Sequence, residues 1–315
     1  MNNRTTPADG ENEAGQTRSG FVALIGAPNA GKSTLVNQLV GTKVSIVTHK
    51  VQTTRALVRG IFIEDQAQIV LVDTPGIFRP KRRLDRAMVT TAWGGAKDAD
   101  IILVLLDSQG GLNENAEALL SSMKDVRRKK VLVLNKVDRV DPPVLLELAR
   151  KANELVAFDQ TFMISALNGS GCKDLAKYLA ENVPNGPWYY PEDQISDMPM
   201  RQLAAEITRE KLYLRLHEEL PYSSTVETER WEERKDGSVR IEQVIYVERE
   251  SQKKIVLGHK GETIKAIGQS ARKEISEILE QTVHLFLFVK VRENWGNDPE
   301  RYLSLIHISE RAGKA

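Results

Sequence analysis

The sequence predicts an α/β domain with a mostly parallel sheet and helices on both faces, followed by an α+β domain. Short apolar runs alternate with segments of helical periodicity between residues 21 and 183. A proline-rich stretch then interrupts this pattern, since neither a helix interior nor a central strand tolerates so many prolines. The expected organisation is a disordered leader, the first domain, a linker, the second domain and an atypical tail, over residues 1–19, 20–183, 184–200, 201–297 and 298–315.

The strands of the first domain are predicted from runs that are apolar at successive positions, as in strands buried on both faces. An additional edge strand, Leu57–Ile63, is expected to run antiparallel and to turn at Glu64–Asp65. Crossover helices are expected at Ser33–Val40, Asn113–Arg128 and Pro142–Phe158, the last with Asp141 as its N-cap. The predicted buried strands are Phe21–Ile25, Ile69–Val72, Ile101–Leu106, Val131–Leu134 and Phe162–Ile164.

The second domain is predicted to mix helices and strands. Its expected order is a helix, two strands joined by a turn at Asp236–Gly237, a helical segment and a final strand. In the linker, Trp188, Tyr189 and Tyr190 are expected to dock on the protein rather than to stack on RNA. The predicted elements are Arg201–Leu216, Ser223–Glu232, Val239–Glu248, Glu262–Leu279 and His284–Val291.

The composition limits the possible classes of protein. The chain has 44 Lys and Arg against 43 Asp and Glu, so any nucleic-acid site must be a local basic patch. Cys172 is the single cysteine, which excludes an internal disulfide and a cysteine metal cluster and fits a reducing compartment. The sequence contains no apolar run of about 18 residues, the length that a membrane span needs. We therefore expect a cytoplasmic protein.

A phosphate-binding loop is predicted between the strand Phe21–Ile25 and the helix Ser33–Val40. Its residues fit the pattern G-x-x-x-x-G-K-S, in which glycines let the backbone wrap a phosphate. The lysine and the helix N-terminus neutralise the phosphate charge, and the serine hydroxyl is a ligand for Mg²⁺. The predicted residues are Gly26, Ala27, Pro28, Asn29, Ala30, Gly31, Lys32, Ser33 and Thr34.

A second phosphate motif, Asp73-Thr74-Pro75-Gly76, directly follows the strand Ile69–Val72. Asp73 is therefore expected at the carboxyl end of a parallel strand, beside the phosphate-binding loop, where it can serve as a carboxylate on the Mg²⁺ side. Gly76 is expected to offer its backbone amide to the γ-phosphate. All four residues are predicted to lie at the phosphates.

Guanine recognition is predicted from Asn135-Lys136-Val137-Asp138, which follows the strand Val131–Leu134. A carboxylate at Asp138 can accept hydrogens from guanine N1 and N2, and adenine offers no such pair. Asn135 is expected to tie the loops together and Lys136 to stack along the base, while the tripeptide Ser165–Leu167 places a backbone amide near O6. The predicted guanine-binding residues are Asn135, Lys136, Asp138, Ser165, Ala166 and Leu167.

A mobile switch segment is expected at Gln52, Thr53, Thr54 and Arg55, in the polar stretch before the edge strand. One of the two threonines is expected to complete the Mg²⁺ shell when GTP is bound, and the pattern does not decide between them. An ordinary exposed loop is the alternative interpretation.

In this order and spacing, the motifs of residues 20–183 resemble the translation-factor-related class of P-loop GTPases. In Ras-like members a glutamine after the aspartate-x-x-glycine motif orients the attacking water. Ile77 follows Gly76 here and can neither donate nor accept a hydrogen bond. We therefore expect slow intrinsic hydrolysis, with the water positioned by another group or by a partner; the catalytic residue stays unknown.

An RNA-binding loop is predicted at Gly258–Gly261, between an apolar strand end at Val256–Leu257 and a helix. The G-x-x-G pattern is weak alone, but residues 251–273 carry six basic side chains against one acidic. The order of elements resembles a type II KH domain, whose loop clamps the RNA backbone. A tight turn beside a solvated helix face is the alternative. The predicted RNA-binding residues are Lys253, Lys254, Gly258, His259, Lys260, Gly261 and Lys265.

The chain as a whole is similar to the Era family of bacterial GTPases over roughly residues 20–297. The motifs above carry the resemblance, together with Leu220–Ser223 and Val247–Glu250. The resemblance implies a GTPase that uses Mg²⁺, binds GTP and GDP, and binds the 3′ end of 16S rRNA through its KH domain. It also implies a role in 30S ribosomal subunit assembly and rRNA processing, with peripheral association with the inner membrane. The sequence leaves the oligomeric state open, although no coiled-coil repeat is evident, and we expect a monomer.

Two other classes of function are weighed against this one. An RNA-binding adaptor that uses nucleotide only for folding would bind RNA equally with GDP and GTP. A tRNA-modifying or membrane-transport GTPase would need a substrate domain or membrane spans, and the sequence indicates neither.

Overall fold

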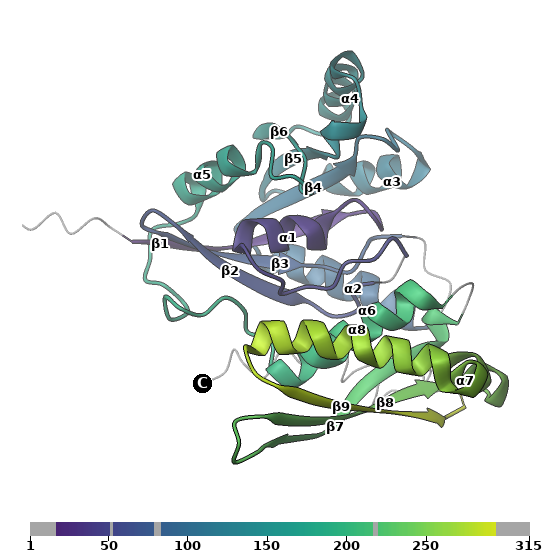
Figure 1. Ribbon diagram of the computed structural model, residues 1–315. Coiled ribbons are helices and arrows are strands. Elements are labelled where there is room, and N and C mark those ends of the chain that lie inside the picture. The colour runs from purple at the N-terminus through teal and green to yellow at the C-terminus, as the bar shows by residue number, and fades with distance from the viewer. Residues whose placement is uncertain (1–16, 51–52, 79–82, 217–219, 294–315) are drawn as a thin grey trace, which may run out of the picture.

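The computed structural model describes residues 17–50, 53–78, 83–216 and 220–293, which form two domains joined by a linker (Figure 1). The predicted tail, residues 298–315, and the first 16 residues of the predicted leader lie outside the described residues. The leader was predicted to extend to residue 19, which is wrong by two residues. Arg18 and Ser19 already pair with Ala67 and Gln68 in the first strand.

The first domain is built on a six-stranded sheet with the strand order β2-β3-β1-β4-β5-β6. All neighbours run parallel except β2, which pairs antiparallel with β3. The predicted strands and the antiparallel edge strand are therefore confirmed, but β6 lies at the other edge of the sheet and only its last residue, Ile164, is buried. The strands are β1 Arg18–Gly26, β2 Val58–Glu64, β3 Ala67–Asp73, β4 Ile101–Asp107, β5 Lys129–Asn135 and β6 Gln160–Ile164.

Helices cover both faces of this sheet. Leu35 of α1 and Leu179 of α5 pack in one apolar core, and Leu120 of α3 and Leu148 of α4 pack in a second core on the opposite face, together with α2. The predicted helices α3 and α4 end earlier than expected, and α2 and α5 were not predicted. The helices are α1 Lys32–Val40, α2 Arg83–Asp98, α3 Glu114–Met123, α4 Pro142–Leu155 and α5 Cys172–Asn182.

Asp141 occupies the N-cap position of α4, but its side chain makes no capping hydrogen bond. An N-cap side chain accepts from the second or third amide of the helix. Pro143 has no N–H, and the Val144 amide donates to the Asp141 carbonyl instead. The predicted N-cap is therefore confirmed in position, and it contributes no side-chain bond.

The linker docks on the first domain along the open edge of β2. The Ile61 amide donates to the Ile195 carbonyl at 2.9 Å, and Arg59 forms an ion pair with Asp197 at 2.6 Å. The Tyr189 ring lies 4.9 Å from the ring of Phe21. Covering an edge strand in this way blocks pairing with other chains. The predicted docking of the linker aromatics is supported for Tyr189.

The second domain has a three-stranded sheet, in the order β7-β8-β9, with its helices on one face. β7 and β8 are antiparallel, whereas β8 and β9 are parallel. Val256 and Leu257 end a helix, α7, so their assignment to a strand end was wrong. Val256 is the buried residue of this short helix. The elements are α6 Met200–Arg215, β7 Ser224–Glu233, β8 Val239–Val247, α7 Glu250–Leu257, α8 Glu262–Leu279 and β9 Val283–Val291.

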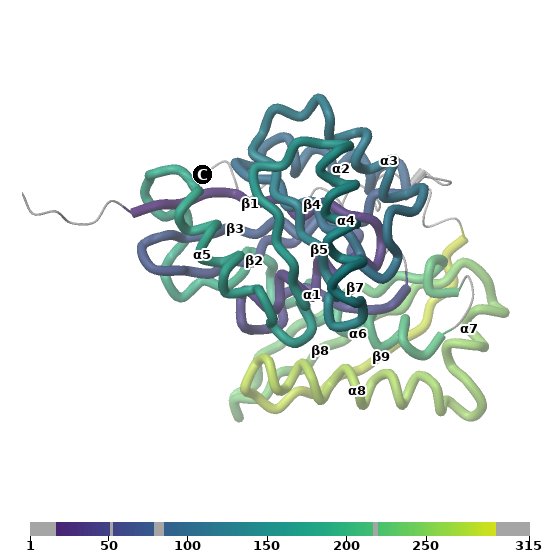
Figure 2. Tube along the Cα trace, turned by 90° about the horizontal axis from the view of Figure 1, so that it is seen from above, coloured from purple at the N-terminus to yellow at the C-terminus, as the bar shows by residue number. Residues whose placement is uncertain are grey.

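The helical face of the second domain is turned toward the first domain. Helices α6 and α8 lie between the two sheets, and β7, β8 and β9 lie on the far side (Figure 1). The view from above shows the same stacking, with the second domain behind the first (Figure 2). Among the residues that the structure describes, no helix is both long and apolar enough to cross a membrane.

Candidate functional site

The predicted phosphate-binding loop lies between β1 and α1, as expected. Gly31 has φ +96°, and a Cβ at this position would lie 2.1 Å from Asn135 Nδ2, so only glycine fits. Lys32 is buried at the loop, where its Nζ donates to the carbonyls of Gly26 and Ala27, both at 3.1 Å. Burial lowers the pKa of Lys32 to about 8, although the Asp73 carboxylate opposes the shift. A bound phosphate would favour the charged ammonium.

The residues predicted for Mg²⁺ converge behind this loop. Ser33 Oγ donates to Asp73 Oδ2 at 2.6 Å and lies 3.0 Å from Thr54 Oγ1. Ser45, which the motifs did not indicate, also donates to Asp73 Oδ2, at 2.7 Å. The Thr53 hydroxyl instead contacts Thr48, at 2.6 Å. Of the two candidate threonines, Thr54 is the one that joins the cluster.

The chemistry of this cluster fits a Mg²⁺ ion. Asp73 is fully buried, and its Oδ1 has no hydrogen-bond partner within the described part of the chain. Burial raises the pKa of Asp73, and the nearby Lys32 ammonium opposes this effect. Mg²⁺ prefers oxygen ligands and keeps waters and phosphate oxygens in its shell, so a carboxylate beside two hydroxyls is an appropriate protein contribution. The orphaned carboxylate oxygen is the specific observation that fits the ion.

The guanine motif links the loops of the site. Asn135 Nδ2 donates to the Ala30 carbonyl at 2.8 Å, and its Oδ1 accepts from the amides of Lys136 and Ala166, at 2.8 and 2.9 Å. This is the linking role expected of Asn135. The Ala166 amide donates to Asn135, so it is not free to face the base. The other groups of the Ser165–Leu167 segment can do so.

Asp107 is a further residue of the site that the motifs did not indicate. It ends β4 opposite Asn135, and its Oδ2 accepts from Lys136 Nζ at 2.6 Å. Its Oδ1 accepts from the Gln109 amide at 3.0 Å. The signal in the sequence was the position of a carboxylate at the carboxyl end of a buried parallel strand.

Most of these groups line one cleft of about 520 Å³, but Asp73 and Ser45 do not. Its volume lies within the range of small-molecule sites. It brings together parts of every nucleotide motif that the described residues contain: Pro28, Asn29, Gly31, Lys32, Ser33, Thr34, Thr53, Thr54, Gly76, Asn135, Lys136, Asp138, Ser165, Ala166 and Leu167. Gln52 lies outside the described residues. Arg55 was predicted in the switch, but its buried side chain points away, toward the second domain.

Ile77 lies next to the cleft without lining it. Its amide donates to the Gly26 carbonyl at 3.0 Å, and its side chain packs against the apolar core on the α2–α4 face of the sheet. Gly76, by contrast, lines the cleft. The side chain after the aspartate-x-x-glycine motif is thus a partly buried apolar group that packs against the core, and it has no atom that could hydrogen-bond to water.

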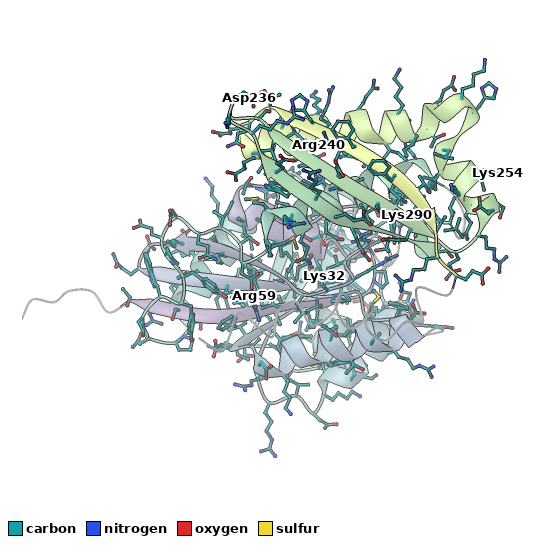
Figure 3. The ribbon with its side chains drawn as sticks, turned by 90° about the horizontal axis from the view of Figure 1, so that it is seen from below. Lys32, Arg59, Asp236, Arg240, Lys254 and Lys290 are labelled. Carbon is teal, nitrogen blue, oxygen red and sulfur yellow. The ribbon has the colours of Figure 1, made fainter. Side chains whose placement is uncertain are left out.

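The glycine loop of the second domain connects α7 to α8. A Cβ on Gly258, with φ +73°, would lie 2.2 Å from Thr263 Oγ1, so the turn requires glycine. Lys254, His259, Lys260 and Lys265 are exposed, whereas Lys253 is half-buried. Figure 3 shows Lys254 at one end of the domain, with the Asp236 turn at the other. The loop thus presents a local basic surface, as predicted.

The fold and the cleft define a P-loop GTPase domain joined to a KH domain. Residues 21–136 match the family model described as 50S ribosome-binding GTPase, and residues 219–296 match the KH domain model. The chain is 93% identical over 302 residues to the GTPase Era of Brucella suis biovar 1 (strain 1330), covering 96% of this chain and 97% of the relative. It is 76% identical over 290 residues to the GTPase Era of Mesorhizobium japonicum, covering 92% and 94%. The chain belongs to the GTPase Era family.

Solved structures agree with this assignment. A crystal structure of Era in complex with MgGDPNP and nucleotides 1506–1542 of 16S ribosomal RNA is 38% identical, has a TM-score of 0.87 and covers 92% of this chain and 98% of that one. A single-residue variant of Aquifex aeolicus Era bound to GDP·AlF4⁻ is also 38% identical, with a TM-score of 0.85 and the same coverage.

Proposed function

We propose that this chain is a GTP-hydrolysing switch that binds 16S rRNA through its KH domain and acts in 30S ribosomal subunit assembly and rRNA processing. The observation that carries the proposal is the coexistence of a complete nucleotide cleft and a basic glycine loop in one chain. A relative of the same two-domain architecture was crystallised with MgGDPNP and a fragment of 16S rRNA.

In the nucleotide cleft, Lys32 and the loop amides hold the β- and γ-phosphates, and Asp138 reads the guanine edge. Ser33 and Thr54 supply hydroxyls on the Mg²⁺ side, and Asp73 supports them. Thr54 is preferred to Thr53 because its hydroxyl lies 3.0 Å from Ser33 Oγ. Mg²⁺, when bound, neutralises the charge that develops on the phosphate oxygens.

Intrinsic hydrolysis is slow in this proposal. The observation behind it is that Ile77 packs in the apolar core, so the position after Gly76 offers no group to the attacking water. A partner, or another group, then has to position the water.

The KH loop binds the 3′ end of 16S rRNA. The exposed side chains of Lys254, His259, Lys260 and Lys265 neutralise backbone phosphates, while Gly258 and Gly261 allow the close approach of the RNA backbone. We also propose that the protein is a cytoplasmic monomer that associates peripherally with the inner membrane and with the 30S subunit, as the family resemblance implies.

RNA affinity with GDP and with a non-hydrolysable GTP analogue, at fixed salt, tests the switch. The switch requires different affinities in the two states, because the nucleotide can shift the equilibrium only through differential binding. Equal affinities would instead support the RNA-binding adaptor. The double variant His259→Asp/Lys260→Asp should abolish RNA binding and leave GTP hydrolysis near normal. Lys235→Asp, on the exposed turn at the other end of the domain, is the matched control.

A further inference from the structure

One polar face of helix α6, in the KH domain, packs against residues 43–50 and 53–55 of the GTPase domain. Glu206, Arg209, Glu210 and Tyr213 share this face, because their spacing places them on one side of a helix. The last three are buried, at 1%, 3% and 0% exposure. Glu210 accepts from the Val47 amide at 2.8 Å. Burying a charged group costs free energy unless the group is paired. The buried charges of α6 therefore depend on the particular partners that they contact at this interface.

Arg209 contacts Thr53, a residue that lines the nucleotide cleft. Its Nη2 donates to the Thr53 carbonyl at 2.5 Å, and its Nε donates to Glu206 Oε1 at 2.8 Å. The guanidinium lies 5.2 Å from the centre of the Tyr213 ring. Burial alone would lower the pKa of Arg209, but the Glu206 carboxylate and Tyr213 raise it overall. A charged, planar group is therefore held rigidly against the switch backbone.

Fixing the Thr53 carbonyl also fixes Thr54. The peptide group is planar, so the carbonyl of Thr53 and the Cα of Thr54 move together. On the other side of Thr54, Arg55 donates to Tyr213 Oη at 2.6 Å and to the Ser224 carbonyl at 3.1 Å. The residue whose hydroxyl reaches Ser33 is thus held from both sides by the KH domain.

We propose that Arg209, on the KH domain, is a positioning residue for the GTP site and acts by fixing the Thr53–Thr54 peptide so that the Thr54 hydroxyl faces Ser33 and Asp73. The inference rests on the proposed role of Thr54 toward Mg²⁺. It means that the GTPase domain alone does not position its own switch threonine.

The test compares Arg209→Gln with Arg201→Gln in the full chain. Arg201 is a matched control on the same helix, since it also donates to backbone carbonyls, those of Thr228 and Glu229, but within its own domain. The measurements are the affinities for GDP and for a non-hydrolysable GTP analogue across a Mg²⁺ titration. Arg209→Gln should weaken binding of the analogue roughly tenfold, as expected for a lost charged hydrogen bond, and change GDP affinity by no more than about twofold.

Three further variants distinguish the positioning role of Arg209 from a purely structural one. Thr54→Ala should cause a similar loss, and the double variant Thr54→Ala/Arg209→Gln should lose no more than Thr54→Ala alone, because both act through one hydroxyl. Arg209→Lys keeps the positive charge, so it should bind the GTP analogue more tightly than Arg209→Gln does. If Arg209→Gln folds poorly, the lysine variant still tests the proposal.

Three results would each overturn the proposal. The losses in the double variant could be additive, Arg209→Gln could weaken binding of GDP as much as binding of the analogue, or its effect could be no larger than that of Arg201→Gln. If Thr54→Ala itself left the Mg²⁺ dependence unchanged, the assignment of Thr54 would fail and this inference with it. If Thr54→Ala weakened analogue binding and Arg209→Gln did not, the positioning role alone would be wrong.

Discussion

Replacing Asp107 by asparagine should weaken guanine nucleotide binding although the residue lies outside every motif. Asp107 Oδ2 holds Lys136 Nζ at 2.6 Å, and Lys136 is the residue proposed to stack along the base. Asparagine can still accept from the Gln109 amide, as Asp107 Oδ1 does at 3.0 Å. The substitution therefore removes the charge of the pair and preserves the turn.

The expected magnitude follows from the exposure of the pair. The side chains of Lys136 and Asp107 are 26% and 30% exposed, so the ion pair is screened by solvent to a considerable degree. A pair of this kind contributes about 1 kcal/mol, near the upper end of the range for surface pairs. Asp107→Asn should thus raise the Kd for GDP and for GTP analogues alike by roughly fivefold.

A double-mutant cycle with Lys136→Met tests whether the effect runs through the lysine. Methionine keeps an apolar stem over the base and removes the ammonium, so Asp107→Asn should have little further effect in that background. Fluorescent GDP titration measures all four proteins, and Asp193→Asn, an exposed aspartate of the linker, is the control. Fully additive losses would show that Asp107 does not act through Lys136, and the reasoning would be refuted.

Three other changes test the nucleotide site. Asp138→Asn should shift preference from GTP toward xanthosine triphosphate, because an amide cannot accept both guanine hydrogens; competition binding measures this, and retained GTP selectivity would count against the assignment. Burial lowers the pKa of Lys32 to about 8, so GDP affinity should be nearly constant below about pH 7 and fall about tenfold by pH 9, as the ammonium that binds phosphate loses its proton; a flat profile in titrations from pH 7 to 9 would contradict this. Ile77→Ala should leave single-turnover GTP hydrolysis within about tenfold of the parent, whereas a loss of several orders of magnitude would show that Ile77 has a direct role.

The first domain was predictable because its signals are local. Buried parallel strands are apolar at successive positions. The phosphate and guanine motifs each stand directly after such a strand, and the carboxyl ends of parallel strands meet at one edge of the sheet, which brings these motifs together. The glycine of the phosphate loop is fixed by a local requirement, the positive φ of Gly31. The motifs could not separate Thr53 from Thr54, since the choice depends on which hydroxyl the folded backbone turns toward Ser33.

Other features depended on tertiary contacts between distant residues. Asp107 contacts Lys136 because β4 and β5 are neighbours in the sheet. The order of the strands determines this contact, and no sequence motif encodes it. Helix α7 was mistaken in part for a strand because its apolar residues, such as Val256, form too short a run to show a helical period. The charged face of α6 resembles a solvated surface in sequence, and only the opposing domain reveals that Arg209 and Glu210 are buried.

The interface between α6 and the switch segment has a thermodynamic consequence for the two proposed activities. If GTP and RNA each favour one arrangement of this interface, their binding is coupled, and the coupling free energy is the same in both directions. A GTP analogue that raised RNA affinity tenfold would then require RNA to raise analogue affinity tenfold. Since Arg209 holds the carbonyl of Thr53, next to Thr54, Arg209→Gln should reduce both factors together. In an RNA-binding adaptor without a switch, neither ligand would change the affinity for the other. A variant that lowered the effect of the analogue on RNA affinity but not the effect of RNA on analogue affinity would be inconsistent with linkage, and it would indicate a second effect of the substitution.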